Sequence, residues 1–479
     1  MKMKHTDKAK RLLLAISILL LYPSCSYYAR NAAQFDAQLT SGNIKEAYKI
    51  VSTNEKKWDK GKDRVLYYLN RGTLAWMLGN NQESYKYFLK ADYYWEDLGI
   101  DYSREALSYL INPRVKEYGG EDFEGIMLSY YQILNFIQMN DLERAQVQAR
   151  RLIIQLNQID DKYKDWQGKN KSTKLQHNAF AHMLLGLVYE LNKDYNGAFI
   201  AYRNSLKFYE DEYSNFFGLN APLQLKKDLL RTAYLSGFPN EVDFYSKKFN
   251  LPFDPQTDAT GGNLIFFWGN GLGPVKQQTS AEFVVAKGSQ TGWYTFSNPN
   301  YGYSIPVFIG SNGNNNNASG NLSDIEFVRA AFPTYVERKP FYQNATLIAN
   351  GQQYPFEAVE DVNATAMKTL NDRMLIEFGK TLARLALKKV AEHQTKKENE
   401  ELGAAVGLIN YFTEQADTRG WNSLPHTLYY TRLSVPQGKQ QVKLTLQGLN
   451  NAVDTATFNF DIKPNRTYVQ PYQTVQSHY

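Results

Sequence analysis

The first half of the chain carries apolar residues at helical spacing, and two of its segments share one arrangement of small and large side chains. In residues 68–95 and 182–209, a small residue stands in a first apolar stretch, a polar turn follows, and a small residue and an aromatic ring stand in a second stretch. Two helices approach closely only where their facing side chains are small. The pattern therefore predicts paired helices in which the ring fills the remaining gap. The positions are Gly72, Ser84 and Phe88 in one segment and Gly186, Ala198 and Tyr202 in the other.

This arrangement is typical of tetratricopeptide repeats. Weaker copies place Gly42 with Ala47 and Asn140 with Ala145. The second small residues, at positions 47, 84, 145 and 198, are 37, 61 and 53 residues apart. The repeat period is about 34 residues, so extra segments must interrupt the array. We expect an α-helical, tetratricopeptide-like solenoid over residues 25–245.

A solenoid of this kind presents a concave groove to partner peptides or helices. Five aromatic residues are candidates to line that groove and contact a partner. The alternative is that most of them are packing residues of the repeats. They are Tyr67, Trp76, Tyr93, Tyr94 and Trp95.

Helical spacing fades in a linker over residues 246–262, and short apolar or alternating runs follow it. Such runs predict strands at 263–271, 281–288, 303–310 and 334–356, with an Asn-rich loop at 311–321. Residues 428–463 predict a three-strand meander whose first turn is Pro436-Gln437-Gly438. The chain is thus expected to be α+β, with a β-rich, sandwich-like domain over 263–360 and 417–479.

An amphipathic helical pattern interrupts these strands at residues 361–416. Val362, Ala366, Leu370 and Met374 recur at every fourth position, and a second helix over 402–416 completes a helical hairpin. Basic residues mark another face of the first helix. This ridge is either solvated or contacts lipid headgroups or an acidic partner, and its members are Lys380, Arg384 and Lys388.

The N-terminus predicts the cellular compartment. Residues 1–24 have the form of a secretory signal peptide, a basic segment followed by the apolar run at 12–21. Such a run spans about 15 Å as a helix, roughly half of a bilayer core, so a transmembrane helix is disfavoured. Cys25 follows Ser24 in a sequence that resembles the lipobox of bacterial lipoproteins. The alternative is a plain signal peptide with an incidental cysteine.

Charge and composition exclude several classes of function. Lys and Arg total 54 and Asp and Glu total 48, but five of the basic residues and one acid precede residue 25, leaving 49 against 47. This balance gives no basis for nucleic-acid binding. Cys25 is the only cysteine, so an internal disulfide and a cysteine-based metal site are excluded. Pro274 stands where a dinucleotide-binding loop at 269–274 would need a small residue. We expect no enzymatic activity, no cofactor and no metal.

The most specific motif lies near the end of the predicted hairpin. It reads Gln415-Ala416-Asp417-Thr418-Arg419-x-Trp421, followed by Leu424-Pro425. Together with residues 269–276 and 360–374, it resembles a family of uncharacterised bacterial lipoproteins with tetratricopeptide repeats, over a span from the lipobox to about residue 445. Arg419 is either a bidentate ligand for a partner's carboxylate or phosphate, or a structural partner of Asp417.

We therefore expect an outer-membrane lipoprotein that is lipid-anchored at Cys25 and faces the periplasm. Ser26 rather than Asp follows the cysteine, which favours the outer membrane, and no acidic cluster follows it, which favours the periplasmic side. Its expected role is a non-enzymatic scaffold or adaptor that binds another envelope protein through the repeats. The resemblance implies the cell-wall synthesis machinery as a candidate partner. The alternative is a SusD-like glycan-binding lipoprotein of a nutrient-uptake system, with Trp268, Trp293 and Tyr294 as sugar platforms.

Overall fold

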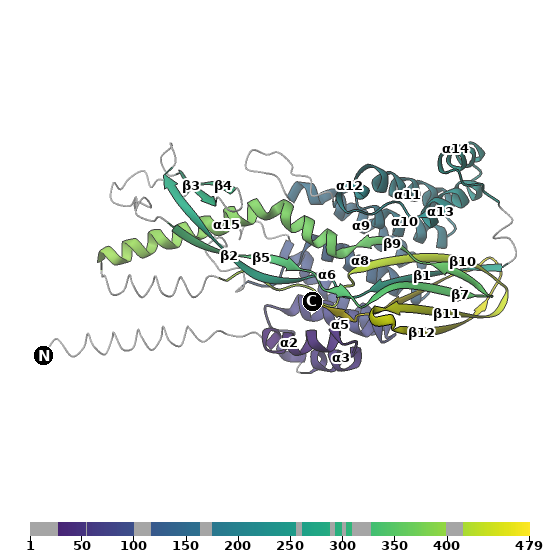
Figure 1. Ribbon diagram of the computed structural model, residues 1–479, viewed down its shortest axis with the longest axis horizontal. Coiled ribbons are helices and arrows are strands. Elements are labelled where there is room, and N and C mark those ends of the chain that lie inside the picture. Colours follow the sequence, from purple (N-terminus) through teal and green to yellow (C-terminus); the bar gives the residue numbers. More distant parts are fainter. Residues whose placement is uncertain are drawn as a thin grey trace.

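The computed structural model describes residues 27–53, 55–99, 116–162, 175–254, 261–287, 293–298, 303–308, 327–398 and 415–479. Helices form the first part of the chain, and β-sheets with one long helix form the second (Figure 1). The predicted order of a helical region followed by β-sheets is confirmed. Cys25 and the Asn-rich segment 311–321 lie outside the described residues.

Helices that follow one another in the sequence pack as pairs, and each pair contacts the next. The pairs are α2 (Tyr27–Thr40) with α3 (Ile44–Ser52), α5 (Arg64–Met77) with α6 (Asn81–Gly99), α8 (Asp122–Gln138) with α9 (Leu142–Lys162), α10 (Ala179–Leu191) with α11 (Tyr195–Phe208), and α13 (Leu223–Leu235) with α14 (Pro239–Phe249). Short helical segments at α4 (Glu55–Trp58), η3 (Tyr209–Tyr213) and α12 (Ser214–Phe216) complete the region.

The turn inside each pair uses one residue with a positive φ, where glycine and asparagine are favoured. These residues are Gly42, Gly79, Asn140, Lys193 and Gly237, with φ of 85°, 79°, 57°, 62° and 72°. Five positions after each of the first four, the second helix buries a small side chain, namely Ala47, Ser84, Ala145 and Ala198.

The predicted fit of rings onto glycines is confirmed. A Cβ atom added to Gly72 would lie 2.7 Å from the Phe88 ring, and one added to Gly186 would lie 2.5 Å from the Tyr202 ring. Both rings are buried, so neither has free space into which to move. The helix pairs are therefore held at a separation that only glycine permits.

Replacement of Gly186 by alanine tests this contact. Tyr202 is also held by a 3.0 Å hydrogen bond from its hydroxyl to Glu190 Oε2, so the ring cannot move without breaking that bond. We expect Gly186→Ala to lower the free energy of unfolding by about 1–3 kcal/mol, the usual cost of overpacking, as measured by urea denaturation.

The matched control is Gly379→Ala in the middle of α15 (Val362–Glu398), where nothing lies within 4 Å of the added Cβ. There the higher helix propensity of alanine should stabilise the protein by up to about 1 kcal/mol. Equal effects at the two glycines would contradict the steric argument.

Within the residues that the structure describes, the second part of the chain forms three four-stranded sheets and one two-stranded sheet. The strand orders are β13-β1-β10-β9, β12-β11-β7-β8, β4-β3-β2-β5 and β14-β6. The strands are β1 (Gly261–Asn270), β2 (Val275–Lys287), β3 (Trp293–Asn298), β4 (Tyr303–Phe308), β5 (Phe327–Val336), β6 (Lys339–Pro340), β7 (Tyr342–Ala349), β8 (Gln352–Pro355), β9 (Glu357–Asp361), β10 (Thr427–Pro436), β11 (Gly438–Gly448), β12 (Val453–Ile462), β13 (Thr467–Gln473) and β14 (Ser477–His478).

The predicted three-strand meander at the end of the chain is wrong. β11 and β12 form an antiparallel hairpin, but β10 pairs with β1 and β9 instead of β11. The turn at Pro436-Gln437-Gly438 carries the chain from the first sheet to the second. The physical reason is that β10 is buried on both faces, and such a strand needs a place in the middle of a two-sided sheet.

The sheet β13-β1-β10-β9 is the central layer of the molecule. One face shares a hydrophobic cluster with β7 and β11, to which Leu264, Phe266 and Trp268 contribute. The other face belongs to the core of the helical region, to which Ile265 and Phe267 contribute. Alternate residues of β1 therefore enter two different cores, which explains its uninterrupted apolar sequence.

The long helix α15 connects β9 to β10 and packs on the third sheet. Its apolar residues Leu370, Met374, Phe378 and Leu382 form one cluster with the side chains of β2, β3, β4 and β5. Arg384 is buried, so its placement on an exposed basic ridge is wrong. The side chains of Lys380 and Lys388, and residues 402–414 of the predicted second helix, lie outside the described part of the structure. Gln415 and Ala416 have irregular backbone.

Candidate functional site

The inner face of the helical region, formed by α5, α8, α10 and α13, is covered by the chain's own central sheet. Tyr130 of α8 contacts Phe267 of β1 with ring centroids 6.0 Å apart. Trp421, just before β10, contacts both Phe88 and Tyr131. The concave surface that the repeat pattern offered to a partner is therefore filled from within the molecule.

A cluster of four buried charges joins the helices to this sheet. Glu190 of α10 lies 2.7 Å from Nη2 of Arg231 in α13 and 2.8 Å from Nη2 of Arg432 in β10. Asp228 lies 2.8 Å from Nη1 of Arg231 and accepts a 2.8 Å hydrogen bond from the hydroxyl of Tyr430. Burial opposes ionisation of Glu190, but the two guanidinium groups outweigh it and lower its pKa to about 2. Two carboxylates and two guanidinium groups thus neutralise each other.

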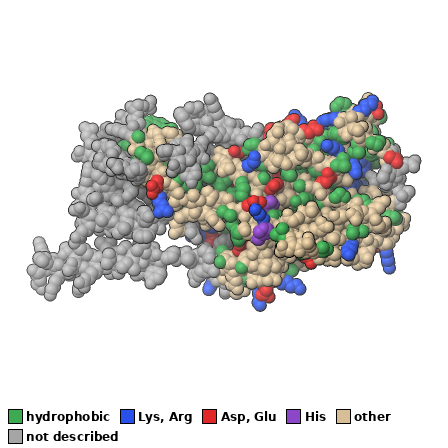
Figure 2. All heavy atoms as spheres, in the orientation of Figure 1, with side chains coloured by type: hydrophobic (Ala, Val, Ile, Leu, Met, Phe, Trp, Pro, Cys, Tyr) green, Lys and Arg blue, Asp and Glu red, His purple; other side chains and the backbone are tan. Residues whose placement is uncertain are grey.

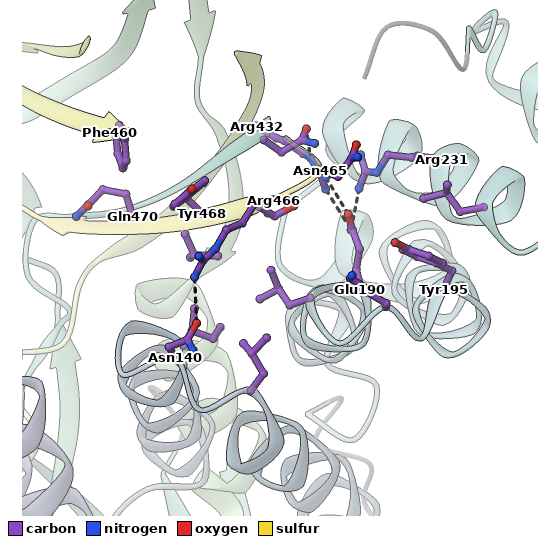
Figure 3. A pocket seen from close by; sticks show the side chains of 18 of the residues that line it. Asn140, Glu190, Tyr195, Arg231, Arg432, Phe460, Asn465, Arg466, Tyr468 and Gln470 are labelled. Atoms are coloured by element: carbon purple, nitrogen blue, oxygen red, sulfur yellow. Dashed lines mark hydrogen bonds and ion pairs between the residues drawn. The ribbon is translucent and has the colours of Figure 1, made fainter. Parts of the chain in front are cut away.

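A groove of about 870 Å³ opens beside this cluster (Figure 3). One wall consists of the turns of the helix pairs, with Asn140 from α8–α9 and Lys193 and Tyr195 from α10–α11. The opposite wall consists of β13 and the turn before it, including Arg466 and Tyr468. Glu190, Arg231, Arg432 and Asn263 form the floor.

The two walls contact each other through polar side chains. Arg466 donates a 3.2 Å hydrogen bond to Asn140 Oδ1, and its guanidinium group lies 5.3 Å from the centre of the Tyr468 ring. Gln138 at the end of α8 donates a 2.6 Å hydrogen bond to the carbonyl oxygen of Val469. Polar and aromatic side chains from helix turns and strands therefore face one another across a shared space.

Two of the aromatic residues predicted to contact a partner are core residues instead. Tyr67 and Trp76 are buried, because Tyr67 packs against Trp58 and Tyr87, and Trp76 packs against Tyr131. Tyr94 and Trp95 are half-buried, and Tyr94 stacks on Tyr68. Tyr93 is 68% exposed on the outer helix α6 and lies apart from the groove.

Arg419 is buried and has a structural role in this fold. Its Nη1 lies 2.9 Å from Asp63 Oδ1 at the start of α5, and its Nη2 lies 2.7 Å from Asp417 Oδ2. It also donates to the carbonyl oxygen of Lys116. Its prediction as a partner-binding residue is wrong, because the helical region and Asp417 already occupy its donors. The pairing of Arg419 with Asp417 is the alternative that the structure bears out.

Two more glutamates are buried where the helical region meets the rest of the chain. Glu124 of α8 accepts a 2.7 Å hydrogen bond from the backbone N–H of Trp421. Burial, and then the nearby charge of Glu121, raise the pKa of Glu124 to about 7. Burial likewise raises the pKa of Glu360 in β9 to about 7, although Thr365 Oγ1 donates a 2.7 Å hydrogen bond to it.

Glu360 should make the stability of the protein depend on pH. Its folded pKa of about 7 is above the ordinary value of 4.5, so the folded state retains a proton that the unfolded state releases. The stabilisation is complete below pH 4.5 and is lost as the pH rises to 7. Glu360→Gln cannot ionise at this position. The free energy of unfolding of the variant minus that of the native chain should therefore be roughly 2–3 kcal/mol larger at pH 8 than at pH 5.

Urea denaturation at both pH values measures this difference. Glu46→Gln, on the exposed surface of α3, is the matched control and should show no such change. A gap between Glu360→Gln and the native chain that is the same at pH 5 and pH 8 would show that Glu360 holds no proton.

One wall of the groove could have been predicted from the repeated turns in the sequence. Lys193 occupies the turn position that Gly42 and Asn140 occupy in the weaker copies of the repeat. An alignment of these turns predicts that Asn140 and Lys193 lie along the same edge of the helical region, at the turns of neighbouring helix pairs. Arg466 and Tyr468 carry no comparable signal, because only the parallel pairing of β13 with β1 brings them to this edge.

The surface and the remaining polar groups that the structure describes show mixed charge and no metal-binding cluster. On the face drawn in Figure 2, Lys and Arg side chains are interspersed with Asp and Glu. Among the described residues, no group of three His, Cys, Asp or Glu side chains is arranged to hold a metal ion. None of the helices described has the length and apolarity needed to cross a bilayer.

No protein-family model matches the sequence, and no curated protein matches it. Among solved structures, BtubC (BKLC) from P. vanneervenii is similar over 51% of this chain and 87% of its own, with 12% identity and a TM-score of 0.32. The assembly chaperone of RpL4 (Acl4, residues 1–338) is similar over 46% of this chain and 87% of its own, with 16% identity and a TM-score of 0.20. Similarities at these values indicate no function.

Proposed function

We propose that this protein is an outer-membrane lipoprotein that acts as a non-enzymatic periplasmic scaffold, binding another envelope protein through its helical repeats. The observation that carries this proposal is the groove of about 870 Å³ beside the helix turns. Because side chains from three helix pairs and from β13 line it together, it suits an extended segment of a partner better than a compact small molecule. Cys25 would tether this surface to the membrane through its lipid chains.

We also propose two features of the fold, one in the helical region and one in the sheets. The helix pairs are tetratricopeptide-like repeats, supported by the positive-φ residue in each turn and the buried small residue five positions later, as in Gly79 with Ser84. The sheets β13-β1-β10-β9 and β12-β11-β7-β8 form a sandwich, supported by the hydrophobic cluster that they share.

A neutral glycan is the second candidate for the groove. Amide side chains from both walls, among them Gln138, Asn465 and Gln470, line it together with tyrosines, and amides bond readily to sugar hydroxyls. The platforms expected for this function are not at the groove. Trp268 is buried between the sheets, with its ring 4.8 Å from that of Tyr429. Trp293 and Tyr294 are half-buried on β3.

The membrane anchor is tested by Cys25→Ser. Without the thiol no lipid can be attached, so the variant should lose incorporation of labelled palmitate and should leave the outer-membrane fraction of the cell. Ser26→Asp is the matched control, since it keeps the thiol and should still incorporate palmitate. Unchanged outer-membrane fractionation of Cys25→Ser would contradict the anchor.

The scaffold role is tested by site-specific photocrosslinking in cells. A photoreactive phenylalanine analogue replaces Tyr195 or Tyr468 in the groove, Tyr93 on the outer helix face, or Lys443 on the exposed side of β11. We expect the two groove positions to give one common crosslinked protein, identified by mass spectrometry, that is absent from the other two positions.

Two other outcomes would contradict this assignment. Crosslinks from Tyr93 alone would show that the partner binds the outer helices and not the groove. If the groove positions give no protein product while purified polysaccharide protects them from labelling, the glycan candidate replaces the scaffold. The full-length chain is used throughout, so the groove stays intact.

A further inference from the structure

The groove has a net charge, although its floor does not. Glu190 and Asp228 neutralise Arg231 and Arg432, and all four side chains are at least nine-tenths buried. Arg231 donates hydrogen bonds to both carboxylates, and Arg432 donates to both carboxylates and to Oδ1 of Asn263. A ligand in the groove therefore meets a polar but neutral floor.

The rim carries the remaining charge, and it is positive. Lys193 and Arg466 are exposed and stand on opposite walls. Within the described part of the chain, neither forms an ion pair with a carboxylate. Figure 3 shows Arg466 directed toward Asn140 from the strand side of the groove.

The acids next to these cations along the helix turns are engaged elsewhere. Asp141 caps α9 and lies 2.6 Å from Nη2 of Arg144. Asp194 caps α11 by accepting a 2.9 Å hydrogen bond from the N–H of Gly197. Both carboxylates are held against their own helices as caps, and neither residue lines the groove.

Lys193 stands at a position where its backbone conformation is unfavourable. Its φ of 62° lies in the left-handed region, and the equivalent turns use Gly42, Gly79, Asn140 and Gly237 there. A long side chain is disfavoured in this region relative to glycine. The turn therefore tolerates a strained residue that supplies a charge to the groove.

The groove wall does not favour binding by strand addition. β13 is an edge strand, but the carbonyl oxygen of Val469 already accepts a hydrogen bond from Gln138 Nε2. Pro471 has no N–H to donate, which is typical of a protected edge. Side chains rather than backbone pairing must hold the ligand.

We propose that the groove binds an extended acidic peptide segment, with Lys193 and Arg466 contacting its carboxylates from opposite walls. This inference rests on the proposed scaffold function only in assigning the segment to a partner protein. The charge complementarity selects the segment, while Tyr195, Tyr234 and Phe253 offer ring and apolar surface along the groove.

Fluorescence anisotropy with the full-length protein in detergent tests the charge preference. The probes are three labelled peptides of equal length on a Gly/Ser/Tyr background, in which every third residue is glutamate, glutamine or lysine. We expect the glutamate peptide to bind about tenfold more tightly than the glutamine peptide, with the difference shrinking as salt is added. Equal affinities for glutamate and glutamine would overturn the proposal.

Lys193→Gly tests the effect of the charge on binding without destabilising the turn. Glycine suits the positive φ, so the thermal midpoint should stay the same or rise, while binding of the glutamate peptide weakens about threefold. Lys193→Glu combined with Arg466→Glu should abolish the preference for glutamate. Lys45→Glu with Lys443→Glu, an equal change of charge at exposed sites away from the groove, should keep it. Equal losses in the two double variants would overturn the proposal.

The two proposals fail in different ways. A protein crosslinked at Tyr195 and Tyr468 whose contacted segment is not acidic overturns the charge preference and leaves the scaffold role. Selective binding of the glutamate peptide, with no protein crosslinked at either position, overturns the scaffold role and supports the groove as an acidic-peptide site.

Discussion

The buried pairing of Arg432 with Glu190 and Asp228 is the interaction on which the arrangement of the molecule depends. It connects a strand of the central sheet to two helices of different pairs. Removing one partner of such a buried set would leave an uncompensated charge, at a cost of roughly 3–5 kcal/mol. Because Tyr202 also bonds to Glu190, the ring that fits against Gly186 is linked to the same cluster. Helix spacing and sheet docking are therefore coupled.

Other polar contacts also join the helical region to the second part of the chain. Glu357 of β9 accepts hydrogen bonds of 2.7 and 2.8 Å from the backbone N–H groups of Leu223 and Gln224, at a helix start where Pro222 has no capping side chain. The carboxylate thus satisfies orphan donors and complements the helix dipole. Arg419 with Asp63 and Glu124 with Trp421 act similarly elsewhere. A sheet held by so many specific contacts is a permanent part of the inner helix face.

Filling that face changes where a partner can bind. The inner face of the helical region is occupied, so the partner that we propose would bind at the row of helix turns and the adjoining edge strand. There the buried charges neutralise one another, so selectivity for the proposed acidic segment would depend on the exposed cations Lys193 and Arg466. The same cluster that closes the inner face thereby makes the floor of the groove neutral. A lipid anchor ahead of residue 27 would present this groove close to a membrane.

The sequence by itself determined the features that depend on nearby residues. Gly72 and Phe88, or Gly186 and Tyr202, are close along the chain, and their steric fit is a local property of two consecutive helices. The continuous apolar run likewise predicted the strand β1, and the four-residue spacing of apolar residues predicted the helix α15. Strand partners were not determined, because β10 joins β1 across more than a hundred and fifty residues. Only the tertiary structure decided that Tyr67, Trp76, Trp268 and Arg419 are buried and that Lys193 and Arg466 line one groove, since burial and shared surfaces depend on which distant parts of the chain meet.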